Sequence, residues 1–225
     1  MEEKQIDLEE IIDKRDLFLD KGLDIENKIV FFSNPENSDS EDIDITDVSV
    51  QDLIKKLMLL DKDRHDKEIT IYFTSNGGDT DAGFSLYDYI KQCKSPTKII
   101  IMGKCFSMSS IILQAANKRI MQKNSTLMIH DGSLAVDSEA KNTEKTAEYN
   151  KQQRFLCYEI LLEKMKNVKR NNKLPEKIKQ IMEKSRMLFS GKGYTINEIE
   201  MLTSTDLYLT AEEALKLHLI DEIIN

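Results

Sequence analysis

The chain has 225 residues, of which 40% are hydrophobic and 32% are charged, and its formal net charge is −8. A chain of this length can bury one sizeable core, and its composition excludes the disordered and fibrous classes, so we expect one globular domain. The acidic balance argues against nucleic acid or an anionic membrane as a main partner, because both attract a basic surface.

The cysteines and the first residues indicate a cytoplasmic protein. Cys93, Cys105 and Cys157 form neither a CxxC pair nor a disulfide framework, which favours a reducing compartment. The opening MEEKQIDLEEIIDKRD is acidic where a signal peptide is basic and then apolar. No apolar run approaches the ~20 residues that span a bilayer, so we expect no membrane contact.

The N-terminal region predicts two helices that flank a strand. An acidic amphipathic helix is expected over about residues 1–22, closed by Gly22. KIVFF (28–32) predicts a strand, and VQDLIKKLMLL (50–60) predicts a helix with one apolar stripe.

From residue 68 onward the pattern becomes regular. The apolar runs EITIYFTS (68–75), KIIIMG (98–103) and STLMIHD (125–131) predict strands. The segments GGDTDAGFSLYDYIKQC (77–93) and SSIILQAANK (109–118) predict the intervening turn and helices. Strands that alternate with helices indicate βα repeats and a largely parallel sheet that is buried on both faces.

The C-terminal third adds helices and a final strand. A long helix is expected over about residues 143–166, followed by a Lys-rich helical insertion over about 163–193. A basic patch in this insertion is the alternative to a solvated, Lys-rich helical pair, which we favour. DLYLTAEEALKLHLIDEII (206–224) predicts a strand, a helix capped by Thr210, and a last strand. Residues 1–225 are thus expected to form one domain with an N-terminal helix and an insertion.

Three strand ends carry residues that suit chemistry. SNGG (75–78) ends one strand, GKCFS (103–107) ends the next, and His130 ends the third. In parallel sheets, functional groups gather at the carboxyl ends of the strands. We therefore expect these turns to lie near one another.

Ser107 is the candidate nucleophile and needs a base, for which histidine is suited near neutral pH. The chain has three histidines. His65 lies in a charged loop and His218 in a helix-to-strand corner, so only His130 is placed at a strand end.

A carboxylate is needed to orient the imidazole. Because the chain has 40 acidic residues, spacing alone cannot select the carboxylate, but Asp206 is the most suggestive candidate. It enters the strand STDLYLT, where we expect its side chain to be shielded.

Main-chain N–H groups at glycine turns and helix starts can bind a developing oxyanion. Gly77 and Gly78 form one such turn, and Met108 supplies an amide after Ser107. Taken singly, each feature also has a structural explanation that we rank slightly higher. The glycines would allow a positive φ, and Ser107 would cap a helix.

In order along the chain, these segments resemble the proteolytic subunit of the Clp protease, the ClpP family. The resemblance covers KIVFF, EITIYFTSNGGDTDAGFSLYDYI, KIIIMGKCFSMSSIILQAANK, NSTLMIH and DLYLTAEEALKLHLID. Five ordered segments make it specific, although the family turn carries Pro where this chain has Asn76, and the stretch before Asp206 is longer than in the family. The chain is thus similar to a divergent member.

The resemblance implies a ClpP/crotonase-type fold of repeated βαβ units and a serine peptidase that acts on polypeptides. It implies Ser107 as nucleophile, His130 as base and Asp206 as acid, with Gly78 and Met108 as oxyanion-hole amides. Ser107 is favoured over Ser109 and Ser110 because it is followed by Met. The family further implies a homo-oligomer of heptameric, stacked rings and an AAA+ unfoldase partner, with no cofactor and no metal.

Two alternatives remain open from the sequence. A non-catalytic ring subunit would keep the fold, but it would leave the presence of all three triad residue types unexplained. A crotonase-type acyl-CoA enzyme would share the paired oxyanion amides, but the Ser, His and Asp set would then have no role.

Overall fold

The computed structural model describes residues 8–33, 43–132, 140–168, 174–184 and 194–225. The helices are α1 (Leu8–Lys21), α2 (Asp47–Leu60), α3 (Thr80–Gln92), α4 (Met108–Ile112), the 3₁₀ turn η1 (Leu113–Ala115), α5 (Ala140–Met165), α6 (Glu176–Lys184), α7 (Ile196–Thr203) and α8 (Ala211–Lys216). The strands are β1 (Leu23–Asp24), β2 (Ile29–Phe31), β3 (Ile69–Ser75), β4 (Thr97–Phe106), β5 (Lys118–Gln122), β6 (Thr126–Ile129), β7 (Leu207–Thr210) and β8 (Glu222–Ile224).

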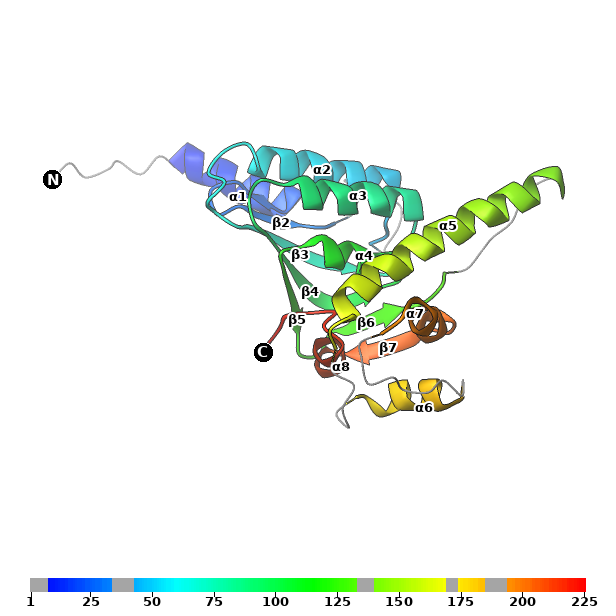
Figure 1. The fold of residues 1–225 in the computed structure, drawn as a ribbon. Coiled ribbons are helices and arrows are strands. Elements are labelled where there is room, and N and C mark those ends of the chain that lie inside the picture. Colours follow the sequence, from blue (N-terminus) through cyan, green and yellow to red (C-terminus); the bar gives the residue numbers. More distant parts are fainter. Residues whose placement is uncertain (1–7, 34–42, 133–139, 169–173, 185–193) are drawn as a thin grey trace.

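The strands form one mixed, mostly parallel sheet. Its main path runs β1-β2-β3-β4-β5-β8, and every pairing from β2 to β8 along this path is parallel. The helices lie on both sides of the sheet, with α2 and α3 side by side over one face (Figure 1). The α/β fold with repeated βαβ units, as expected from the alternating pattern, is confirmed.

Strand β4 belongs to two parts of the sheet. Its first half pairs with β3 and β5, whereas Lys104–Phe106 pair with β6. Gly103 lies between the two halves with a φ of 83°, a left-handed conformation that favours glycine, and its N–H donates to Ser125 Oγ. Beyond this bend, the C-terminal end of β4 pairs with β6 in place of β5, while Cys105 still pairs with Ser75 of β3.

The core is packed between the central strands and the helices. Ile71 of β3 and Ile99 and Ile101 of β4 are fully buried on one face of the sheet, whereas the alternate residues of β3 are only partly buried, so the expected burial on both faces does not hold for β3. Leu53 and Leu57 project from α2 onto this layer, four residues apart on one helical face. The expected apolar stripe of this helix is therefore confirmed.

One predicted helix is shorter in the structure, and strand β5 and helix α7 were not predicted. The helix expected over 109–118 ends earlier, because η1 stops at Ala115 and Lys118–Gln122 form β5 beside β4. The short run KRIMQ has only two apolar residues, so it carries too little pattern to signal a strand. Helix α7 was not predicted, although Thr195 and Glu198 form a capping box at its start.

The two appendages expected from the sequence lie partly outside the described residues. The N-terminal segment forms α1, and the Lys-rich insertion contributes the end of α5 and all of α6. Within the described part of the chain, no helix is both long and apolar enough to cross a membrane.

Candidate functional site

Ser107 lies at the sharp turn between β4 and α4. Its φ is 54° and its ψ is −127°, a conformation that is rare for a residue with a side chain and costs about 1–3 kcal/mol. Its hydroxyl makes no capping hydrogen bond to α4. Ser107 therefore occupies the N-cap position of α4, as the structural explanation has it, but its side chain does not cap the helix, and the strained turn presents the hydroxyl at the end of β4.

Strand register brings the candidate triad together. The Ser107 N–H donates to the carbonyl of Met128, which places Ser107 beside the end of β6, where His130 follows. Antiparallel pairing of Ile129 with Leu207 then places His130 next to Asp206, the residue before β7.

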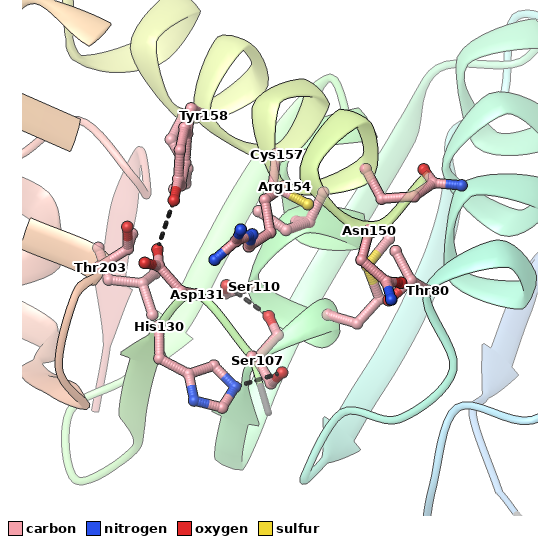
Figure 2. A pocket seen from close by; sticks show the side chains of 16 residues that line it. Thr80, Ser107, Ser110, His130, Asp131, Asn150, Arg154, Cys157, Tyr158 and Thr203 are labelled. Carbon is pink, nitrogen blue, oxygen red and sulfur yellow. Dashed lines mark hydrogen bonds between the residues drawn. The ribbon is translucent and has the colours of Figure 1, made fainter. Parts of the chain in front are cut away.

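The three side chains form a continuous chain of contacts. His130 Nε2 lies 2.7 Å from Ser107 Oγ, and His130 Nδ1 lies 3.0 Å from Asp206 Oδ1. Figure 2 shows the first of these contacts. Both distances are those of hydrogen bonds. The spatial arrangement required for a base-activated serine is therefore present, with Asp206 placed to fix the imidazole.

Asp206 is more exposed than we expected. Its side chain keeps 55% of its accessible surface, against 21% for His130. The reason is its position in the loop before β7, whereas the burial expected for a strand residue begins only at Leu207. Solvent screens the attraction between an exposed carboxylate and an imidazolium, so the orienting hydrogen bond is the main contribution of Asp206 in a single chain.

Gly77 packs closely against the serine turn, and Gly78 packs against the backbone of Ile45. Gly77 has a φ of 101°, and a Cβ added to it would lie 2.7 Å from the Cβ of Ser107. Gly78 has a φ of 143°, and an added Cβ would lie 2.3 Å from the carbonyl oxygen of Ile45. Both positions therefore require glycine, which agrees with the structural explanation given for the pair. The contact of Gly77 with Ser107 also brings the glycine turn and the serine turn together.

The amides at these turns differ in their partners. The Gly77 N–H donates to Ser75 Oγ, so this amide is already used. Among the described residues, neither the Gly78 N–H nor the Met108 N–H donates to a protein acceptor. These two amides are the ones expected to bind an oxyanion, and both remain able to donate to a ligand.

The neighbouring serines are engaged elsewhere. Ser110 Oγ donates to the carbonyl of Ser107 at 2.6 Å, and Ser109 Oγ is buried without a hydrogen-bond partner in the described structure. Of the three hydroxyls, only that of Ser107 contacts His130. The geometry therefore favours Ser107 over Ser109 and Ser110 as the candidate nucleophile, which is also the serine chosen from the sequence.

The other two histidines lie away from this site. His65 Nδ1 lies 3.5 Å from Asp61 Oδ1 on the partly exposed turn after α2. His218 is exposed at the corner after α8, with a φ of 59°, and its carbonyl accepts from the Arg119 guanidinium. His65 thus lies in the charged loop and His218 at the helix-to-strand corner where the sequence placed them.

A pocket of about 110 Å³ opens beside Ser107. It is bounded by α4, by the end of β6 and by α5, which crosses above them (Figure 2). The residues from α5 are Asn150, Gln153, Arg154, Cys157, Tyr158 and Leu161. None was predicted from the sequence, because polar residues occupy the inward stripe of α5 and the helix shows no apolar periodicity.

Asp131 follows His130 but is directed away from it. The Tyr158 hydroxyl donates to Asp131 Oδ1 at 2.7 Å, and the Asp131 N–H donates to the carbonyl of Thr203. Burial and the hydrogen bond to Asp131 raise the pKa of Tyr158 to about 12, so its hydroxyl stays protonated at neutral pH. Burial likewise raises the pKa of the Cys157 thiol to about 12, which leaves this thiol un-ionised and weakly nucleophilic.

Metal ligands are not grouped in the part of the chain that the structure describes. No set of three or more His, Cys, Asp or Glu side chains there could hold a metal ion. The site is instead built from a hydroxyl, an imidazole, a carboxylate and main-chain amides.

Comparison with known proteins gives the class. The family model described as Clp protease matches residues 42–190, so the chain belongs to the Clp protease family. Among individual relatives, the chain is similar to the ATP-dependent Clp protease proteolytic subunit of Deinococcus radiodurans, with 28% identity over 203 residues. The match covers 89% of this chain and 82% of that protein. The resemblance to the ClpP family is confirmed, and the chain is a divergent member.

Proposed function

We propose that this protein is a serine endopeptidase that cleaves unfolded polypeptides or peptides through Ser107, His130 and Asp206. The observation that carries the proposal is the chain of contacts from Ser107 Oγ through the His130 ring to Asp206. Membership of the Clp protease family supports the reaction class.

The acylation step follows from this geometry. Ser107 Oγ attacks the carbonyl carbon of the scissile peptide bond, and its proton passes to His130 Nε2. The Asp206 carboxylate accepts from His130 Nδ1–H and stabilises the imidazolium. The Gly78 and Met108 amides donate to the negatively charged oxygen of the tetrahedral intermediate, in a site whose donors are already oriented.

The intermediate then collapses and the acyl-enzyme is hydrolysed. The C–N bond breaks as His130 Nε2 returns its proton to the departing amine, which leaves the peptide acyl group on Ser107 Oγ. A water molecule next gives its proton to His130 and attacks the ester carbon. The C–Oγ bond breaks, Ser107 recovers its proton from His130, and the carboxylic acid product leaves.

We further propose that the chain works as a homo-oligomeric ring that receives substrates from an AAA+ unfoldase. The relative from Deinococcus radiodurans carries ATP dependence in its name. Large apolar side chains remain exposed on two helices, with Phe155 and Leu156 on α5 and Val48, Met58 and Leu59 on α2. Such surfaces suit contact between subunits.

Light scattering tests the proposed assembly. It should give the mass of a ring, and a monomer at micromolar concentration would contradict the proposed ring.

Turnover of a labelled unfolded protein tests the proposed activity. We expect wild type to release peptides, Ser107→Ala and His130→Ala to show none, and Asp206→Asn to lose about 10³- to 10⁴-fold in kcat. Asp66→Asn, in the exposed loop before β3, is the matched control and should keep wild-type turnover.

The two alternative functions give different results in the same assay. A non-catalytic ring subunit would assemble but show no turnover that depends on Ser107. An acyl-CoA enzyme would turn over a thioester and leave the peptide bond intact.

A further inference from the structure

The stripe of α5 that faces Ser107 is polar where a helix covering a core is usually apolar. Asn150, Gln153, Arg154 and Tyr158 all line the pocket, at helical spacings of three and four. The nearby apolar walls are Met108 and Ile111 of α4 and Leu161 of α5. The pocket thus combines apolar side chains with a few polar side chains from α5, a combination typical of sites that select their ligands.

Arg154 is the cation among the polar residues of α5 that line the pocket. Its guanidinium end points from α5 into the pocket, toward the side that carries Asp131 and Ser110 (Figure 2). Its Nε is buried and has no hydrogen-bond acceptor, and no ion pair joins the side chain to another residue of the described ranges. The buried Nε–H has no acceptor, which is unfavourable, so an anionic ligand that reaches it would stabilise this side chain.

Asp131 is the carboxylate in the same pocket, but it already has a partner. Its Oδ1 accepts from the Tyr158 hydroxyl, and it forms no ion pair with Arg154. The donors of Arg154 are therefore left for a substrate. A guanidinium matches a carboxylate through two parallel hydrogen bonds, whereas a cationic side chain would be repelled.

We propose that this pocket binds the side chain of the residue on the amino side of the scissile bond, and that Arg154 makes it select an acidic residue. The inference rests on the proposed peptidase function. That side chain branches from the carbon next to the scissile carbonyl, so it lies nearest to Ser107 when the carbonyl is attacked. Its methylenes would contact Ile111 and Leu161, and its carboxylate would reach Arg154.

Matched peptides test the selectivity. Four fluorogenic peptides differ only at this residue, which is Glu, Gln, Leu or Lys. We expect wild type to prefer Glu over Gln by about tenfold to a hundredfold in kcat/KM, the usual effect of one charged hydrogen-bonded contact. Arg154→Met should remove the preference, Arg154→Lys should restore part of it, and Arg154→Glu should favour the Lys peptide.

Lys151→Met is the control, because it removes a cation from the exposed side of the same helix. It should keep the wild-type order of peptides. A Glu-to-Gln ratio that is the same in wild type and Arg154→Met would overturn the inference while leaving the peptidase function intact.

Binding to an inactive protein separates this inference from the reaction itself. Fluorescence polarisation with Ser107→Ala measures the affinity of the labelled Glu and Gln peptides without cleavage. Tighter binding of the Glu peptide that is lost in Ser107→Ala/Arg154→Met supports the role of Arg154 even if wild type cleaves nothing. Equal affinities in both proteins contradict it, whatever the outcome of the cleavage assay.

Discussion

The backbone of Ser107 is strained by the need to turn sharply out of β4 and to present its hydroxyl to His130. A φ of 54° is ordinary for glycine but costly for serine or alanine. The N–H of the same residue is held by the Met128 carbonyl, so the turn cannot relax without loss of that hydrogen bond. The strain therefore serves the proposed reaction.

This strain predicts a difference in stability between two replacements of Ser107. Ser107→Gly should be more stable than Ser107→Ala by about 1 kcal/mol, because only glycine adopts this φ without cost. Both variants should be inactive. Urea unfolding followed by circular dichroism measures the difference, and Ser85→Gly against Ser85→Ala, inside α3, is the control, in which the order should reverse.

The sequence could place the three candidate triad residues at strand boundaries, and their joint assignment rested on the order of the segments that resemble the family, but the residues around them could not be predicted. Ser107, His130 and Asp206 stand at strand boundaries, which a sequence pattern marks well. The exposure of Asp206 depends on where β7 begins, and a shift of one residue decides it. Arg154 and Tyr158 gave no signal, because their role depends on how α5 crosses the end of the sheet rather than on local pattern.

Among the elements, the insertion helix α6 contacts β7, the strand that follows Asp206, through Lys177. Lys177 Nζ lies 2.7 Å from Glu213 Oε2 at the start of α8 and also donates to the carbonyl of Tyr208 in β7. The length of the insertion was visible in the sequence, but its contact with β7 was not. These bonds suggest that α6 stabilises the strand that positions the acid.

Loss of the Lys177 contacts should make Ser107 less reactive, because β7 and the adjacent Asp206 would be held less firmly. Lys177→Met is expected to slow the inactivation of Ser107 by a fluorophosphonate by a few fold, because each lost charged contact at a partly exposed site is worth about 1 kcal/mol. Lys179→Met is the matched control, since Lys179 pairs with Glu176 on its own helix. Equal inactivation rates in wild type and Lys177→Met would show that α6 is not coupled to the triad.

In the whole molecule, β5 and β8 are joined by Arg119 and Asp221. The Arg119 Nε and its backbone N–H both donate to Asp221 Oδ2, at 3.0 Å and 2.8 Å. Partial burial acts to raise the pKa of Asp221, but the hydrogen bonds from Arg119 outweigh it and lower the pKa below its usual 3.8. The ionised carboxylate is therefore favoured by folding.

The sign of this shift predicts a pH dependence of stability. A lowered pKa in the folded state gives stability that is present above pH 3.8 and lost as the pH falls through the folded value. Asp221→Asn should reduce the free energy of unfolding at pH 7 by about 1–2 kcal/mol, an effect limited by solvent screening. The difference from wild type should shrink at pH 3. Urea titrations at both pH values measure it, and a difference that grows on acidification would contradict the assignment.

The parallel sheet itself was predictable, because apolar strands alternating with helices leave few other arrangements. The pairing of β4 with both β5 and β6 was not, since it depends on the bend at Gly103 and on a strand too short to leave a pattern. That bend is what carries Ser107 to His130. The site is thus a consequence of the whole sheet and not of one motif.

The most direct test of the triad is covalent labelling with a fluorophosphonate, followed by peptide mass spectrometry. We predict that the adduct forms on Ser107, that Ser107→Ala and His130→Ala are not labelled, and that Ser109→Ala is labelled as wild type is. An adduct on another residue, or equal labelling of Ser107→Ala, would contradict the assignment of Ser107 as the nucleophile.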